Sequence, residues 1–236
     1  MKKLFIVANW KSNKTISESL QWLQEMSQSQ LTSSDAREII VCPSFTVLSE
    51  MKKFISENNL PIKLGTQDIS PFAEGAYTGA IAARQAAELV THAIIGHSER
   101  RKYFHETDED VIAEVKQLLA NKITPILCVS DMQQMDYFLA HDPVIVDHAD
   151  EIIFVYEPPS AISGGGAFHP ETPEDANKNA ATISEKIGKR VITLYGGSVN
   201  PDSAAALFAQ EHIDGGLIGQ ASLKTDMFIN IIKSFS

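Results

Sequence analysis

Residues 4–8, Leu-Phe-Ile-Val-Ala, are apolar at five consecutive positions, and the polar Asn9 follows them. A strand with one face in solvent alternates apolar and polar residues, whereas a strand buried on both faces is apolar throughout. Seven further short runs rich in apolar and β-branched residues follow along the chain, at 38–42, 61–65, 92–95, 123–128, 152–156, 191–195 and 213–218. The sequence therefore predicts eight strands in a buried parallel sheet.

The segments between these runs have the start and stop signals of helices. Residues 108–120 follow Thr107 and repeat apolar residues at helical spacing, and residues 173–187 begin with a proline and end before Gly188. A last helix is expected from about 222 to 234. The connection between the fifth and sixth strands leaves room for only one short helix, near 131–141.

A strand followed by a helix, repeated eight times, favours a closed (β/α)8 barrel, with a doubly wound open sheet as the alternative. No low-complexity linker, charge block or internal repeat divides the 236 residues. Residues 1–236 are therefore expected to form one domain, and that length is sufficient for a large core.

Composition excludes several kinds of protein. The chain has 20 Lys and Arg against 30 Asp and Glu, a formal net charge of −10, so a nucleic-acid partner is not expected. No apolar run approaches the roughly 18 residues of a membrane span, and the first run is too short for a signal peptide. Cys42 and Cys128 are expected to be buried thiols in a cytoplasmic protein that binds no metal.

Polar residues that can carry chemistry follow several of the strands. In a parallel barrel the active site lies in the loops after the strands. Asn9 and Lys11 follow the first strand, His97 and Glu99 the fourth, and Glu157 the sixth. A carboxylate, an imidazole and an ammonium group can exchange protons or stabilise developing negative charge.

Two turns of small residues follow the seventh and eighth strands, Gly196-Gly197-Ser198 and Gly219-Gln220-Ala221-Ser222. Such turns present backbone N–H groups with little steric obstruction, and phosphate binds at this place in many barrels. A phosphate-anchored small molecule beside a base, an imidazole and a cation suits proton abstraction next to a carbonyl.

Each of these residues also has a purely structural interpretation. Taken singly, Glu157 would be a solvated loop residue or helix cap, His97 a hydrogen-bonded structural histidine, and Lys11 a surface lysine. Unrelated structural needs would scatter such residues over both ends of a barrel. Their position after three different strands therefore favours an active site.

The same residues resemble the motifs of the triosephosphate isomerase family. Asn9-Trp10-Lys11 followed by Asn13, then Gly-His-Ser-Glu-Arg-Arg at 96–101, Tyr-Glu-Pro at 156–158 and Tyr-Gly-Gly-Ser-Val at 195–199 are similar to its motifs at strands one, four, six and seven. The resemblance runs in order from residue 4 to about residue 223. It implies a single-domain TIM barrel that interconverts dihydroxyacetone phosphate and glyceraldehyde 3-phosphate without a cofactor or metal.

The resemblance also implies a role for each residue. Glu157 would move a proton between C1 and C2, and a neutral His97 would polarise the carbonyl, a division of roles for which this family is itself a standard example. Lys11 would offset the charge of the substrate and the enediolate, and Asn9 would bind a substrate oxygen. Glu99 would pair with Lys11 without taking part in proton transfer.

By the same resemblance, the phosphate would lie against backbone N–H groups of Ser163, Ser198, Gly219 and Gln220. The family forms homodimers in which the loop after strand three enters the neighbouring active-site region. Residues 67–79 resemble that loop, with Thr78 placed to reach across. Phe72 and Tyr77 on this loop would be poorly placed on the surface of a monomer, which supports a homodimer.

The segment after Glu157 departs from the family pattern. Residues 158–166 read Pro-Pro-Ser-Ala-Ile-Ser-Gly-Gly-Gly, so that Ser160 replaces a tryptophan and Ser163-Gly164-Gly165 replaces Gly-Thr-Gly. The three glycines at 164–166 have more freedom to lose on ordering, at about 1–2 kcal/mol per residue. We expect a less favoured closed lid, with a raised KM or lowered kcat and an unchanged reaction.

Two other functions remain open at the level of the sequence. One is a sugar-phosphate isomerase or lyase of altered specificity on the same barrel. The other is a non-catalytic phosphate-binding dimer. The intact set of Lys11, His97 and Glu157 argues against the second.

Overall fold

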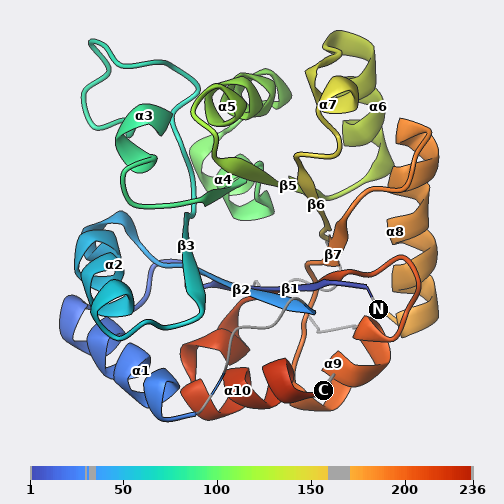
Figure 1. The fold of residues 1–236 in the computed structure, drawn as a ribbon. Helices are drawn as coiled ribbons and strands as arrows, with labels where there is room; N and C mark the ends of the chain where they lie inside the picture. Colours follow the sequence, from blue (N-terminus) through green and yellow to red (C-terminus); the bar gives the residue numbers. More distant parts are fainter. Residues whose placement is uncertain (1, 30, 32–35, 159–170, 235–236) are drawn as a thin grey trace.

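Eight parallel strands pair in chain order and close into a barrel, with β1 pairing to β8 as well as to β2 (Figure 1). The structure is a computed structural model that describes residues 2–29, 31, 36–158 and 171–234. The strands are β1 (Leu4–Asn9), β2 (Arg37–Cys42), β3 (Ile62–Thr66), β4 (His92–Ile95), β5 (Thr124–Val129), β6 (Ile153–Tyr156), β7 (Thr193–Tyr195) and β8 (Gly215–Ile218). The predicted barrel is confirmed, and the open sheet is excluded.

Helices surround the barrel and connect successive strands (Figure 1). They are α1 (Ile16–Gln28), η1 (Phe45–Val47), α2 (Leu48–Glu57), α3 (Ala83–Ala86), α4 (Ser98–Phe104), α5 (Asp108–Ala120), α6 (Met132–His141), α7 (Val144–Asp147), α8 (Pro173–Ile187), α9 (Pro201–Phe208), η3 (Gln220–Leu223) and α10 (Thr225–Lys233). The described residues form one domain.

Alternate residues of the strands, apart from β3, divide between two cores. Leu4, Ile6 and Ala8 of β1 face the helices, whereas Phe5 and Val7 belong to a separate cluster inside the barrel. Apolar side chains from β2 and β4 to β8 complete that inner cluster. Both faces of the sheet are thus buried, which explains the continuous apolar runs.

The barrel closes where β8 meets β1, and a glycine makes this contact possible. Gly215 lies opposite Phe5, has a φ of +135°, and a Cβ added to it would lie 2.0 Å from the carbonyl oxygen of Phe5. No side chain fits in that space, and the backbone conformation is one that L residues avoid. The closing register therefore depends on glycine at this position.

The helix predictions hold at 108–120 and 173–187, where Thr107 and Thr172 cap α5 and α8 with their side chains. The prediction of only one short helix between β5 and β6 is wrong, because α7 follows α6. Asp142 is extended and ends α6, and Pro143 begins the next turn, which its missing N–H permits.

The last predicted helix, 222–234, is also divided. A 3-10 turn, η3, ends before the extended Lys224, and α10 begins at Thr225. This interruption is important for the site, because it lets the chain turn around the mouth of the barrel after β8.

The free cysteines are buried as predicted, Cys42 and Cys128 both within the inner cluster. Burial raises the pKa of both thiols above the usual range. No helix in the described part of the chain is long and apolar enough to cross a membrane.

Candidate active site

Lys11 lies just beyond the end of β1 in a conformation that non-glycine residues rarely adopt, with a φ of +51°. Its backbone is held at both ends. The Lys11 N–H donates to Oδ1 of Asn9 over 3.0 Å, and its carbonyl accepts from Nε2 of Gln67 over 2.8 Å. Strained residues of this kind persist only where their surroundings fix them, and they concentrate at functional sites.

The Lys11 side chain extends across the barrel mouth. Its Nζ forms an ion pair with Oε1 of Glu99. Its Cε lies 3.7 Å from the position that a Cβ would occupy if Gly219 carried a side chain. Strands β1 and β8 and helix α4 thus converge on one ammonium group. The expected pairing of Lys11 with Glu99 is present in the structure.

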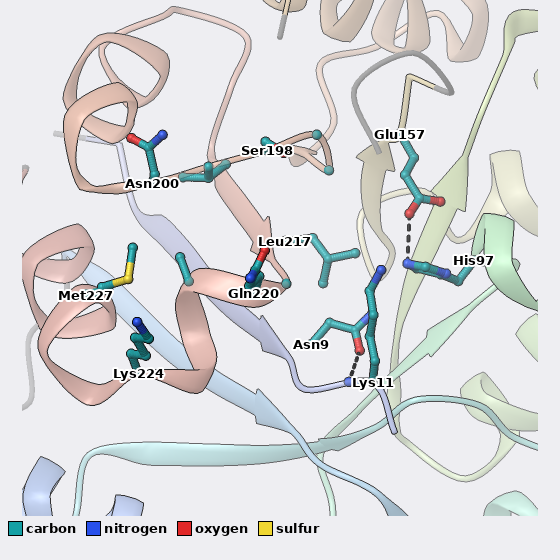
Figure 2. Close-up of a pocket in the computed structure, with 15 residues that line it drawn as sticks. Asn9, Lys11, His97, Glu157, Ser198, Asn200, Leu217, Gln220, Lys224 and Met227 are labelled. Carbon is teal, nitrogen blue, oxygen red and sulfur yellow. Dashed lines mark hydrogen bonds and ion pairs between the residues drawn. The ribbon is translucent and has the colours of Figure 1, made fainter. Parts of the chain in front are cut away.

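Glu157 and His97 contact each other directly (Figure 2). Nε2 of His97 lies 2.9 Å from Oε1 of Glu157, and the backbone N–H of Ser98 donates to Oε2 of Glu157 over 3.1 Å. The carboxylate is 1% exposed and His97 is 5% exposed. Two groups therefore hold the carboxylate of Glu157, which must turn away from them to reach an atom elsewhere in the pocket.

The start of α4 sets the tautomer of His97. His97 is the N-cap of α4, and its Nδ1 accepts a hydrogen bond of 3.1 Å from the backbone N–H of Glu99. A ring nitrogen that accepts from an N–H carries no proton, so the proton of the neutral ring lies on Nε2. His97 thus directs a neutral N–H donor into the site.

Gly196, directly after β7, leaves the space that Glu157 occupies. A Cβ on Gly196 would lie 2.6 Å from Cγ1 of Val155 and 3.1 Å from Cγ of Glu157. A side chain here would displace the carboxylate or the strand beneath it. The glycine that sequence reasoning assigned to a phosphate turn therefore also makes room for the acidic group.

Tyr156 and Tyr195, the last residues of β6 and β7, are buried on the side of the sheet that faces the helices, and both are neutral at ordinary pH. The hydroxyl of Tyr156 donates to Oε1 of Glu171 over 2.9 Å and accepts from Nδ2 of Asn179 over 2.9 Å. Burial and the Glu171 carboxylate raise the pKa of Tyr156, and burial raises the pKa of Tyr195 to about 12. Neither phenol competes with Glu157 as a base.

Most of the expected site residues line one pocket of about 490 Å³ (Figure 2). These are Asn9, Lys11, His97, Glu157, Ser198, Gly219 and Gln220. Glu99 does not line the pocket but pairs with Lys11, which does. Thr78 lies elsewhere, on the exposed loop after β3. Ser163 lies outside the described residues. Of the described residues lining the pocket, only Glu157 carries a carboxylate.

Lys224, Asn200 and Met227 also line this pocket, and sequence reasoning missed them. Lys224 lies in the break between η3 and α10, which was expected to be continuous helix. Asn200 is the N-cap of α9, and its Oδ1 accepts from the backbone of Asp202 and Ser203. The Asn200-Pro201 pair was a readable capping signal, whereas nothing in the sequence marked Lys224.

Lys224 has a special place in the electrostatics of the pocket. The charge of Lys11 is offset by Glu99, whereas no ion pair of Lys224 is found in the described part of the chain. The protein as a whole carries a net charge of −10. Of the two lysines that line the pocket, Lys224 is therefore the one whose charge is available to attract an anion.

A buried carboxylate facing an imidazole N–H, with an ammonium group beside them at the carboxyl ends of the strands, equips the barrel for proton transfer. The fold and this site together define an enzyme of the (β/α)8-barrel class that is equipped for acid–base chemistry.

Comparison with known proteins identifies the family. The Triosephosphate isomerase family matches over residues 4–235. A triosephosphate isomerase from Alkaliphilus metalliredigens is 38% identical over 254 residues, covering 99% of this chain and all of the relative. The triosephosphate isomerase of Thermus thermophilus is 37% identical over 251 residues and 99% of each chain. The chain belongs to the triosephosphate isomerase family.

The geometry at the start of α4 makes a prediction about the His97 ring. In 15N-edited spectra of the ligand-free protein at pH 7.5, Nδ1 of His97 should have the chemical shift of an unprotonated nitrogen, and Nε2 that of a protonated one. The spectrum of His97→Gln assigns the signals. A proton found on Nδ1 would contradict the hydrogen bond from Glu99.

Proposed function

We propose that this chain interconverts dihydroxyacetone phosphate and glyceraldehyde 3-phosphate by proton transfer through an enediolate, without a metal or organic cofactor. The observation that carries the proposal is the contact of Glu157 with the Nε2 of His97 inside a pocket that Lys11 also lines. Family membership supports the same reaction. The alternative function is an isomerase or lyase on the same barrel that acts on a sugar phosphate of another size.

The proposed reaction uses each group in turn. With the ketose bound, the carboxylate of Glu157 turns away from Ser98 and takes a proton from C1, and the electron pair of the C–H bond moves into the new double bond. The carbonyl oxygen becomes negative, and Nε2–H of His97 stabilises it by a hydrogen bond or proton transfer. His97 gives its Nε2 proton to the C2 oxygen and takes up the proton of the C1 hydroxyl, and return of the proton from Glu157 to C2 then gives the aldose.

Lys11 and Asn9 would assist without exchanging the proton. The ammonium group of Lys11 lies where it offsets negative charge on the substrate oxygens. Because Oδ1 of Asn9 is used by the backbone of Lys11, its NH₂ group is the part that donates to a substrate oxygen. Both residues are therefore assigned to binding and charge stabilisation.

The phosphate is proposed to lie between the turns after β7 and β8, against Ser198, Gly219 and Gln220. The β8 turn is well anchored, since the carbonyl of Ser222 accepts from Nε1 of Trp22 over 3.1 Å. The contribution of Ser163 and the less favoured closed lid expected from Ser160 and Gly164–Gly166 concern residues outside the described part of the chain. They stay predictions, as does the cytoplasmic location.

Glu157→Gln tests the base. We expect kcat/KM for glyceraldehyde 3-phosphate to fall by about 10²- to 10⁴-fold, because Gln cannot accept the proton. The matched control is Glu185→Gln, which neutralises an exposed carboxylate on α8 and should keep full activity. A folded wild-type protein no more active than Glu157→Gln would exclude the isomerase and favour a phosphate-binding protein. Selective turnover of a larger sugar phosphate would favour the altered-specificity alternative.

Lys224→Met tests electrostatic attraction of the substrate. At low ionic strength kcat/KM should fall by about tenfold with kcat little changed, and its dependence on salt should flatten, since an unpaired cation near the pocket acts on the encounter. Lys233→Met removes a charge from the last turn of α10 and serves as the control. Equal salt slopes for wild type and Lys224→Met would contradict this role.

A homodimer is proposed from the loop after β3. Phe72 and Tyr77 stack at 4.3 Å between ring centroids, yet each is 47% exposed. With Phe45, Ile69 and Pro71 they line a groove of about 510 Å³ that also reaches Thr78. An exposed aromatic groove of this kind is typical of an interaction surface, which here would accept the corresponding loop of a second copy.

Tyr77→Asp tests this surface. A charge placed in a desolvated contact should reduce the mass measured by light scattering at micromolar concentration to about half that of the wild type. Ala140→Asp introduces the same charge on the exposed side of α6 and should leave the mass unchanged. A wild-type protein with the mass of one chain would exclude the dimer.

A further inference from the structure

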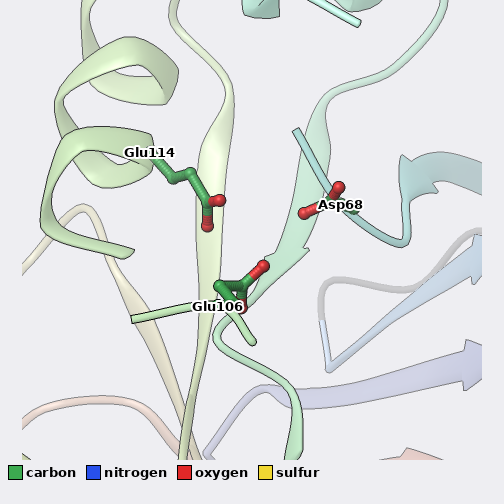
Figure 3. A group of neighbouring side chains, drawn as sticks. All are labelled: Asp68, Glu106 and Glu114. Carbon is green, nitrogen blue, oxygen red and sulfur yellow. The ribbon is translucent and has the colours of Figure 1, made fainter. Parts of the chain in front are cut away.

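Three carboxylates meet at a place that is separate from the reactive pocket (Figure 3). Asp68 follows β3, Glu106 lies between α4 and α5, and Glu114 lies in the middle of α5. Each offers one oxygen, and these oxygens all lie within 4.8 Å of one another. Residues separated by nearly fifty positions in the chain thus present acidic groups to a common point.

Two members of the cluster are buried, and its three carboxylates face a single cation. Glu114 is 1% exposed, and the side chain of Glu106 is 3% exposed. Among the described residues one cation contacts the group: Nε of Arg100 lies 2.8 Å from Oδ1 of Asp68 and 2.5 Å from Oε1 of Glu106. With all three carboxylates ionised, one guanidinium would leave two negative charges in excess.

Two oxygens of the cluster lack a partner. Oε2 of Glu114 and Oε2 of Glu106 are buried and have no hydrogen bond to the rest of the described chain. Figure 3 shows the Glu114 carboxylate directed toward the other two residues. A buried, unpaired acceptor is costly, and a charged one more so, unless another group fills the position.

We infer that Asp68, Glu106 and Glu114 bind one hard divalent cation of about the size of Ca²⁺. Carboxylate oxygens are the ligands that such ions prefer, and the 4.8 Å limit on the oxygen separations is about twice a Ca–O bond of roughly 2.4 Å. A single doubly charged ion balances the excess charge and supplies the partner that the two Oε2 atoms lack. Mg²⁺, with bonds of about 2.1 Å, requires the oxygens to draw closer.

Such an ion would hold α4 in place. Arg100 is on α4, two residues after Ser98, and it contacts two of the three proposed ligands. Ligation fixes those carboxylates, and they in turn fix the guanidinium and the helix whose N-cap is His97. The site is therefore assigned a structural role, and it does not depend on the reaction proposed above.

The test measures thermal unfolding of the whole protein after dialysis against EDTA and then metal-free buffer. Ca²⁺ or Mn²⁺ at about a hundredfold excess over Kd should raise the wild-type Tm by about 5 °C or more, and Mg²⁺ should raise it less. Glu114→Gln and Asp68→Asn should each lose the response. Glu185→Gln, which removes an exposed carboxylate from α8, should keep it.

Calorimetric titration with Ca²⁺ supplies a second measurement, with an expected stoichiometry of one ion per chain for wild type and Glu185→Gln. A wild-type protein that shows neither heat of binding nor a Tm response would overturn the inference, and protons would then be the groups that neutralise the cluster. A response retained in Glu114→Gln would also overturn it, because the ion would then bind elsewhere.

Discussion

The contact between β1 and β8 at Gly215 is the constraint on which the rest of the molecule depends. Seven of the strand pairings join strands that are consecutive in the sequence, but this one joins the first strand to the last. It requires the backbones of Phe5 and Gly215 to approach so closely that no side chain fits between them. Closure brings Lys11, which follows β1, against Gly219, which follows β8. It also gives every strand two partners, so no edge remains among the described strands, and it directs all eight carboxyl ends to one mouth.

The arrangement of the barrel was well predicted because burial on both faces leaves a direct trace in the sequence. The run at residues 4–8 has no polar position, and the structure places alternate members of it in two different cores. Helix α5 was predicted to the residue, since Thr107 at its start has a local capping function. The extra turn α7 was missed because Asp142 and Pro143 read as the end of a helix, and only the structure shows that another turn follows.

The positions of the candidate site residues could be predicted where a residue ends a strand or follows it within two positions, because strand order alone fixes its position. Asn9, His97 and Glu157 are of this kind. Lys224 lies six residues beyond the end of β8 and reaches the pocket through a break in helical structure that no local signal requires. Gln67 holds the backbone of Lys11 across 56 positions of sequence, and an amide side chain gives no sign of such a distant partner. Long-range contacts of this type arise from packing and are visible only in the fold.

The two cysteines inside the barrel can report whether its strands are closed. Cys42 and Cys128 belong to the cluster enclosed by the strands, and burial keeps both thiols protonated and out of reach of solvent. A thiol reagent modifies only the thiolate, and solvent reaches these sulfurs only when strands separate. The rate at which the two cysteines are modified will therefore follow the opening of the barrel. Thiol labelling can thus measure how often the native protein opens between its strands.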